Sequence, residues 1–511
     1  MSSKKFFIFA ALVLGNAVSA SADAPLSAID WLSDTVTTPV VMQPPAKETD
    51  ITSDASVEDV TVTTLGGPTP DAVGLLPVSV TGLPRAFWGA TASGELARLV
   101  RQQPVQSLPA LEDLLKMILL AELDAPVDAD GTGALFLARI DKLLDLGSLD
   151  QAQALLERAG PHTADLFRRW FDVALLTGTE HAACATLKDN ADIAPTFPAR
   201  IFCLARNGDW NAAAVTLETA KVLGYITKEE DALLARFLDP ELFEGQPPLP
   251  TPKHVTPLIF RMREAIGEPI PTVNLPRAFA NADLRSNTGW KSQIEAAERL
   301  ARTGAIDPNR MLGIYTERLP AASGGVWERV DAVQAFDTAL TTHDPGAVAK
   351  ALPAVWREME RAELEVPFAT LYGERLGKLP LAGDVATLAF HVGLLSPDYE
   401  KVAGGFHPVT DGDRFLVALA QGDLSNVSAP NARATAIKTA FQATETPAQF
   451  APLLADNQLG KAILQAITLF ADGAEGDLEE VRKALILLRS VGLEDTARRA
   501  AIQLMLLERR G

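Results

Sequence analysis

The sequence predicts an all-α protein, an α-solenoid of helix–turn–helix repeats with a disordered N-terminal arm. Three observations support this fold class. Apolar residues make up 47% of the 511 residues and aromatic residues only 6%, a balance typical of helices rich in Ala and Leu. From about residue 96, apolar residues recur at spacings of three and four, the period of one helix face. Three glycine turns also recur at a nearly constant spacing.

The first segment, residues 1–22, is predicted to be a cleavable signal peptide. Lys4 and Lys5 precede an apolar run from Phe6 to Val18, and small residues ending at Ala22 follow it. The run is shorter than the roughly 20 residues that a membrane-spanning helix needs. A retained membrane anchor is the alternative. The leader therefore predicts an exported, soluble protein located in the periplasm.

The charge of the chain excludes one class of partner. Its formal net charge is −19, and loss of a leader that carries two lysines and no acid takes it to −21. Such a field repels the phosphates of nucleic acids and anionic lipid surfaces. We therefore expect no nucleic acid partner.

Residues 23–84 are predicted to form a disordered, acidic arm rich in Thr and Pro. The segment contains one basic residue, Lys47, and no sustained helical period. Two apolar islands interrupt it, at residues 26–32 and 73–78. Trp31 and Leu32 are candidate partner-binding residues, because an exposed Trp in such an arm can anchor a docking motif. Alternatively, the islands pack against the body of the protein.

Residues 85–240 are predicted to form an N-terminal helical-repeat lobe. Its turns contain Gly147, Gly178 and Gly208, which lie 31 and then 30 residues apart. In each unit a Ser, Thr or Asp follows the glycine, an Ala lies five residues after it and a Leu nine. We expect the glycine to end one helix in the left-handed conformation and the next side chain to cap the following helix. The small Ala would let the two helices cross closely.

This pattern resembles the tetratricopeptide-like α-solenoids over about residues 135–225. The usual unit of that family has 34 residues, and its full Trp, Tyr and Pro pattern is absent here. The resemblance implies stacked helix pairs and a habit of binding peptides, but no particular substrate. The alternative is three helical hairpins that match by chance.

The two cysteines, Cys184 and Cys203, are predicted to form a disulfide. An even number of cysteines in an exported protein permits a bridge, and the two would lie on neighbouring helices of the stack. Two free thiols are one alternative. A metal site shared with His181 is another, although a structural zinc site needs about four ligands.

Beyond the repeats, a Pro-rich linker is predicted at residues 241–275 and a C-terminal helical lobe at residues 276–511. Helices are expected at 290–304, 326–340, 344–361 and 381–395, and a loop at 396–413. His407 lies in this loop near Asp411 and Asp413, and a solvated loop is the simpler interpretation. No residue pattern in the chain names a reaction, a metal site or a cofactor.

These observations predict a periplasmic helical-repeat scaffold, not an enzyme, that binds a protein partner in the cell envelope. The alternative is a cell-wall-acting, lytic-transglycosylase-like enzyme built on a helical superhelix, although no Glu-Ser catalytic setting is found. The two hypotheses differ in what they predict. The enzyme requires a deep pocket with an ionisable pair of shifted pKa, and the scaffold a broad groove without one.

Overall fold

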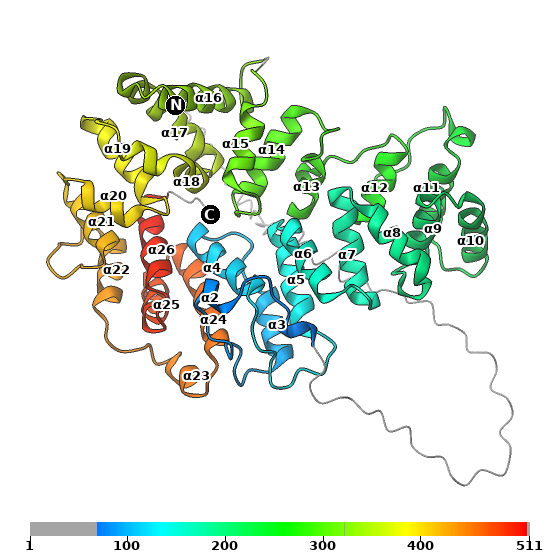
Figure 1. Cartoon of the computed structure of the whole chain (residues 1–511), viewed down its shortest axis with the longest axis horizontal. Coiled ribbons are helices and arrows are strands. Elements are labelled where there is room, and N and C mark those ends of the chain that lie inside the picture. The colour runs from blue at the N-terminus through cyan, green and yellow to red at the C-terminus, as the bar shows by residue number, and fades with distance from the viewer. Residues whose placement is uncertain (1–68, 321, 508–511) are drawn as a thin grey trace, which may run out of the picture.

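The computed structural model describes residues 69–320 and 322–507, and this part of the chain is helical (Figure 1). No β-strand occurs among these residues, and the only pairing of extended backbone there is an isolated bridge between Leu76 and Ala121. The predicted all-α class is thus confirmed. The predicted signal peptide and the candidate residues Trp31 and Leu32 lie outside the described residues.

The first half of the described chain is a series of helix pairs. After η1 (Pro70–Ala72) and α2 (Val78–Thr81) come α3 (Ser93–Arg101), α4 (Pro109–Leu120), α5 (Ala134–Leu146), α6 (Leu149–Ala159), α7 (Ala164–Thr177), α8 (Glu180–Asp189), α9 (Phe197–Arg206), α10 (Trp210–Val222) and α11 (Lys228–Leu238). From α5 to α11, each helix packs on the next one in the chain. Helices two apart also touch, as α5 with α7 and α9 with α11, so the pairs stack side by side.

The turns of this stack follow the predicted pattern in most respects. The three repeat glycines have φ of +81°, +81° and +87°, the left-handed region that Cβ-bearing residues rarely enter. The alanines and leucines at the repeated positions are all buried: Ala152, Ala183, Ala213, Leu156, Leu187 and Leu217. The pattern therefore identifies the three turns and the contacts beneath them.

The predicted capping of these turns is wrong in two of three cases. Asp209 does cap α10, since its Oδ1 accepts from the backbone N–H of Ala212 at 3.1 Å. Ser148 and Thr179 make no such bond. The Thr179 hydroxyl lies 3.0 Å from that of Thr177 instead, so a neighbouring side chain competes for it.

The end of the predicted arm is part of the folded body, so the boundary at residue 84 is placed too late. Asp71 is buried and its Oδ1 accepts from the N–H of Phe136 at 2.7 Å. The fully buried Arg139 donates to the carbonyls of Val73 at 2.9 Å, Leu119 at 2.8 Å and Ala121 at 3.0 Å. For the island at 73–78, packing on the protein's own body is therefore the correct alternative.

The second half begins with short elements and continues as a curved row of helices. These are η3 (Pro240–Phe243), α12 (Pro257–Ala265), η4 (Thr272–Asn274), η5 (Arg277–Phe279), α13 (Ala280–Asp283), α14 (Trp290–Ala301), α15 (Pro308–Thr316), α16 (Val326–Thr341), α17 (Pro345–Ala362), α18 (Glu365–Leu376), α19 (Gly383–Leu394), α20 (Tyr399–Gly405), α21 (Asp411–Gln421), α22 (Ala432–Gln442), α23 (Ala451–Ala455), α24 (Leu459–Ala474), α25 (Leu478–Ser490) and α26 (Glu494–Leu506).

Most of the helices expected in this half are present. However, α20 lies where a loop was expected: Tyr399 and Ala403 are buried on the same helix face, so packing stabilises a helix that local glycines obscured.

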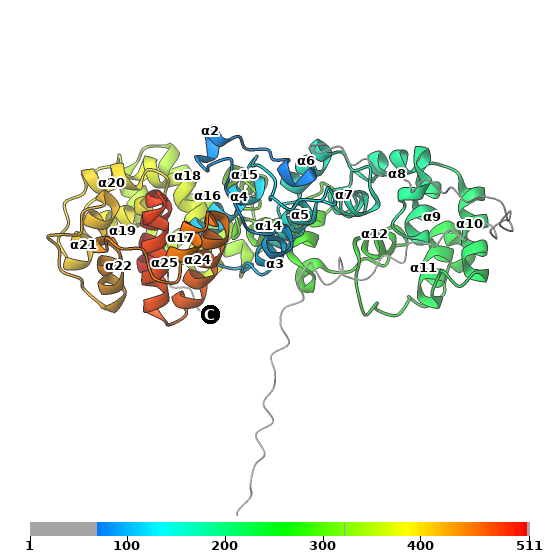
Figure 2. The same ribbon diagram turned by 90° about the horizontal axis from the view of Figure 1, so that it is seen from below.

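The C-terminal helices return to the N-terminal ones. α24 packs on α3, and α26 packs on α4. Figures 1 and 2 show the resulting layout, with α24–α26 beside the first helices and α8–α11 extending away at the opposite end. The helices in and just after the Pro-rich segment also contact the stack, since α12 and α13 both pack on α7.

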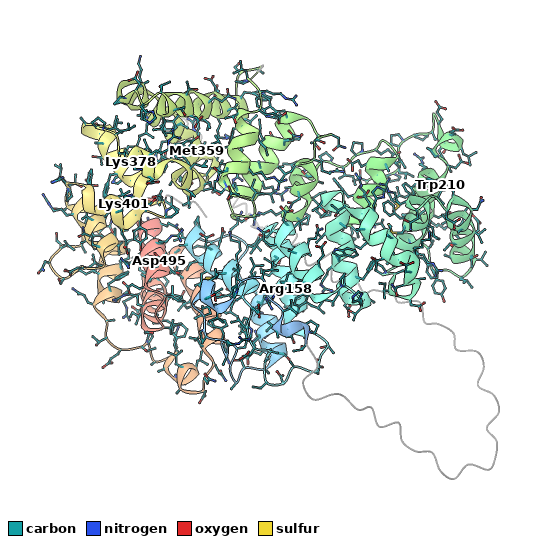
Figure 3. All side chains as sticks on the ribbon, viewed as in Figure 1. Arg158, Trp210, Met359, Lys378, Lys401 and Asp495 are labelled. Atoms are coloured by element: carbon teal, nitrogen blue, oxygen red, sulfur yellow. A yellow bond between two sulfur atoms is a disulfide. The ribbon has the colours of Figure 1, made fainter. Side chains whose placement is uncertain are left out.

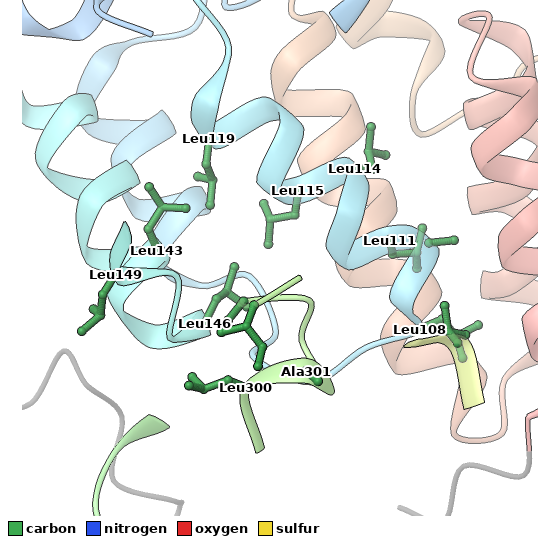
Figure 4. Close-up of a cluster of buried hydrophobic side chains, with 14 of the residues drawn as sticks. Leu108, Leu111, Leu114, Leu115, Leu119, Leu143, Leu146, Leu149, Leu300 and Ala301 are labelled. Atoms are coloured by element: carbon green, nitrogen blue, oxygen red, sulfur yellow. The ribbon is translucent and has the colours of Figure 1, made fainter. Parts of the chain in front are cut away.

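Leucines of α4, α5 and α6 form a buried core that also receives α14 (Figure 4). Leu300 of α14 lies here, and a Cβ built on Gly147 would fall 2.6 Å from its Cδ2 atom. The side chains of Asn281 and Thr303 donate to the carbonyls of Gly147 and Leu146 at 3.0 and 2.9 Å. Residues more than 130 positions apart in the chain are thus held together at the α5–α6 turn.

Candidate functional site

The disulfide predicted from the sequence is present. Cys184 on α8 is bonded to Cys203 on α9, with their Cα atoms 4.8 Å apart, and both residues are buried. The bridge therefore joins two consecutive helix pairs. His181 contacts the guanidinium of Arg206 at 3.0 Å, and no cluster of three metal-ligating residues occurs among the described residues.

Exposed apolar side chains gather at the far end of the stack. Trp210 is 50% exposed, Val215 67% and Val222 87%, and all three lie on α10. Leu223 and Tyr225, just after this helix, are also exposed. We call these five residues the tip surface. Trp210 lies at the end of the molecule in Figure 3, far from the body formed by the C-terminal helices.

The tip surface follows from the sequence of α10. Its inner face consists of Ala213, Leu217 and Ala220, which pack on the rest of the stack. Val215 and Val222 are seven residues apart, so they lie on one stripe of the opposite face. The end of a helical stack normally carries a polar outer face that keeps it soluble. An apolar stripe at this position is typical of an interaction surface.

A second candidate site is a cavity of about 1080 Å³ beside α14. We call it the arginine cavity, because four arginines line it. Its charged lining residues are Arg277, Arg299, Arg302, Arg329, Asp145, Asp283, Glu295 and Glu298. Apolar residues such as Val273, Leu275 and Ala296 complete the wall. The cavity thus has both apolar surface and an unusual number of guanidinium groups.

One of the four arginines is neutralised by a carboxylate. Arg329 donates from Nε and Nη2 to the two oxygens of the buried Glu298, both at 2.7 Å. The Tyr315 hydroxyl donates to the same carboxylate at 2.7 Å. Burial, followed by the adjacent Glu298 carboxylate, raises the pKa of Tyr315 well above its usual value. This network fixes one wall of the cavity.

The other three arginines bind backbone carbonyls. Arg277 Nη1 donates to the carbonyl of Val105 at 3.0 Å, and Arg302 Nε to that of Ala362 at 2.7 Å. Arg299 donates to the carbonyls of Thr272, at 2.9 Å, and Leu275.

The charges of these three arginines act on one another. Burial, and then the charges of Arg277 and Arg302, lower the pKa of Arg299. Burial, together with the repulsion of Arg302, lowers the pKa of Arg277, and the attraction of Glu112, Asp145 and Glu363 opposes this shift. The Arg277 Nε atom is buried without a hydrogen-bond partner among the described residues. Acidic and basic groups thus alternate around the cavity, and burial and repulsion between arginines lower the pKa of two of them.

Three further carboxyl groups line the cavity. Asp145 is paired with Lys142 at 3.1 Å and Glu295 with Lys291 at 3.6 Å. Burial raises the pKa of Asp283, whose carboxylate accepts a hydrogen bond from the Thr272 hydroxyl.

Sequence reasoning missed the arginine cavity, although a local signal was available. Residues 261–310 contain seven arginines and one lysine against six acidic residues, a positive segment in a strongly negative chain. Sequence reasoning did, however, identify the loop that contains His407 near Asp411 and Asp413 as a polar cluster. There, Asp413 pairs with His391 at 2.9 Å, and not with His407.

Comparisons with protein-family models, curated proteins and solved structures found no match for this chain. No helix in the described part of the chain is both long and apolar enough to cross a membrane.

Proposed function

We propose that this protein is an exported helical-repeat scaffold that binds a protein partner of the cell envelope through its tip surface. In this proposal, helices α5–α10 act as a short tetratricopeptide-like α-solenoid. The observation that carries the proposal is the apolar stripe of Val215 and Val222 on the outer face of α10. A large apolar side chain left in water forgoes about 1.5–3 kcal/mol of burial free energy, which a docked partner would recover.

Two further features support an exported scaffold. The basic and apolar leader at residues 1–22 is typical of a signal peptide, and a disulfide between Cys184 and Cys203 suits an oxidising compartment. The bridge also stiffens the base on which α10 rests, because Cys203 belongs to the helix that packs on α10. A rigid surface loses less conformational entropy on binding.

The proposal is tested by affinity capture from an envelope extract of the cells that make the protein. A tip variant, Val215→Asp with Val222→Asp, is compared with the wild-type protein. The matched control is Val127→Asp with Val409→Asp, which adds the same charge at two other exposed valines, each 80% exposed. We expect one partner to be captured by the wild type and the control and lost from the tip variant. Equal capture by all three would refute a role for the tip surface.

The same capture tests the contribution of the predicted arm. A variant lacking residues 23–68 removes Trp31 and Leu32 but keeps the segment from 69 onward, which Arg139 holds. Loss of the partner from this variant alone would locate binding in the arm and not at the tip.

The arginine cavity favours the alternative of a cell-wall-acting enzyme in one respect. It is a large pocket with a carboxyl group, Asp283, whose pKa burial raises, and general acids need such a shift. The alternative predicts that the purified protein cleaves peptidoglycan and that Asp283→Asn abolishes cleavage. The scaffold proposal predicts no cleavage by either.

A further inference from the structure

We propose that the tip surface binds a basic amphipathic helix, in which Lys or Arg side chains flank an apolar stripe. This partner chemistry deepens the proposed function, on which it rests, because it describes the segment that docks on α10. The side chains along the exposed face of α10, the contacts that hold this helix in place and the acidic groups at both ends of the face support it.

The exposed face of α10 suits close contact with another helix. Ala214, Val215, Thr219 and Val222 are all exposed, and their spacings of three, four and seven residues place them on one stripe. The Thr219 hydroxyl donates to the carbonyl of Val215 at 2.8 Å, so it needs no partner across an interface. The side chains are short and lack charge, and a second helix could therefore pack at roughly 8–10 Å between axes. A helix with apolar residues three and four positions apart presents the matching stripe.

Aromatic contacts hold both ends of this stripe in place. Trp210, half-exposed at the start of α10, lies 6.4 Å from Phe237 of α11, measured between ring centroids. Tyr225, just after α10, stacks on Phe197 of α9 at 5.0 Å. Figure 3 shows Trp210 at the end of the molecule. The surface is thus fixed before a partner arrives, which lowers the ordering cost of binding.

α11 runs antiparallel to α10, and this direction places different segments beside the two ends of the stripe. Lys221, near the end of α10, pairs with Asp231 in the first turn of α11 at 3.1 Å. Trp210, at the start of α10, contacts Phe237 near the end of α11. The first turn of α11 therefore lies beside one end of the stripe. The η3 turn, which follows α11 and packs on it, lies beside the other end.

Both of these segments carry exposed carboxylates. Glu229 lies in the first turn of α11, Glu241 in η3 and Glu244 directly after η3, and all three are exposed. We call these three residues the acidic rim. No ion pair within the described part of the chain involves them. Their charges are therefore available to a partner at both ends of the apolar stripe.

The bases around the stripe do not offset this charge. Residues 207–244 contain eight acidic residues and three basic ones. Lys221 is bound by two carboxylates of the segment, at 3.1 and 3.2 Å, and Arg236 by Glu268 at 2.9 Å. Lys228 is the one base of this segment without a carboxylate partner. A helix with Lys or Arg beside its apolar stripe complements such a surface, and an acidic helix is repelled.

The test is fluorescence anisotropy of two labelled peptides with the full mature protein, at an ionic strength near 0.15 M. Both peptides are amphipathic helices of about 18 residues with the same leucine stripe, and the other positions are Lys in one and Glu in the other. We expect the Lys peptide to bind with a Kd below about 100 μM and the Glu peptide at least about tenfold more weakly. No binding of the Lys peptide, or equal binding of both, would overturn the proposal.

Two variants locate the binding. Val215→Ser with Val222→Ser removes the apolar stripe without a change of charge, and it should weaken binding of the Lys peptide at least about tenfold. The rim variant, Glu229→Gln with Glu241→Gln and Glu244→Gln, should weaken it about threefold to a hundredfold, since up to three exposed ion pairs are lost.

A charge-matched control removes three exposed carboxylates beside α23 and in or next to α24, at the opposite end of the molecule (Figure 1). Its substitutions are Asp456→Asn, Asp472→Asn and Glu475→Gln. We expect its affinity for the Lys peptide to stay within about twofold of the wild type. Equal weakening by this control and the rim variant would mean that the peptide responds to net charge alone, and the proposal would be wrong. Circular dichroism of each variant verifies that it is folded.

The affinity capture described above distinguishes this proposal from the proposed function. The expected result is a partner that is lost from the tip variant and from the rim variant and kept by the charge-matched control. A partner lost from the tip variant but fully kept by the rim variant would overturn the basic helix and leave the scaffold function standing. A partner kept by the tip variant would refute the scaffold function of the tip surface itself.

Discussion

Replacing Gly147 by Ala should destabilise the junction between α5–α6 and α14. The glycine has φ of +81°, where a residue with a Cβ atom costs about 1 kcal/mol. The new Cβ would also lie 2.6 Å from Leu300 Cδ2 and 3.1 Å from Arg277 Cγ. Both contacts are closer than van der Waals distance, and such overpacking of a core costs about 1–3 kcal/mol. The expected loss of unfolding free energy is therefore about 2–4 kcal/mol.

Gly208 provides a matched control for the backbone effect. Its φ is +87°, and a Cβ built there meets no atom within 4 Å. Gly208→Ala should thus cost only the strain, about 1 kcal/mol. Urea unfolding followed by circular dichroism measures both values, and the difference between the variants isolates the packing against Leu300.

Hydrogen exchange shows where the stability is lost. Gly147→Ala should lower amide protection in α14, and Gly208→Ala should leave it unchanged. Equal destabilisation by the two variants, with α14 equally protected in both, would refute the argument that this glycine joins the two halves of the chain.

Three further predictions concern other buried groups. Replacing Cys184 and Cys203 by Ser opens a loop between residues separated by 19 positions, and thermal unfolding should show a loss of about 3 kcal/mol; no change on reduction would contradict this. Burial raises the pKa of Glu112 to about 7, above its usual value of 4.5. The protonated side chain therefore stabilises the folded state fully below pH 4.5. This stabilisation, about 3 kcal/mol in total, is lost as the pH rises to about 7. Glu112→Gln should flatten this part of the urea-midpoint profile, and an unaltered slope would be the opposing result. Arg139→Met leaves buried carbonyls without donors, so it should cost about 3 kcal/mol and expose residues 69–76 to limited proteolysis; unchanged resistance would argue against the proposed anchor.

The features that local spacing determines could be predicted from the sequence. The repeat glycines, the buried alanines and the disulfide each depend on residues within about one helix pair, where turn geometry and helix periodicity fix the neighbours. Asp307 illustrates the same point, since it precedes a proline and its side chain caps the first turn of α15.

Features that depend on distant residues could not be predicted in this way. The return of α24 and α26 to α3 and α4 depends on which apolar faces fit together, and any helix face of similar character would satisfy the local pattern. Arg139 is a charged residue within an apolar helix, and it donates to carbonyls of two other segments, Leu119 and Val73. The arginine cavity likewise combines residues from several elements, so only its local excess of positive charge was visible in the sequence.

Site-specific photocross-linking in living cells would test the proposed scaffold function most directly. A photoreactive amino acid replaces Val215 at the tip surface or, as a control elsewhere, the more exposed Val127. The account predicts one discrete cross-linked envelope protein from position 215 and none from position 127. No product at position 215, or the same products at both positions, would contradict it.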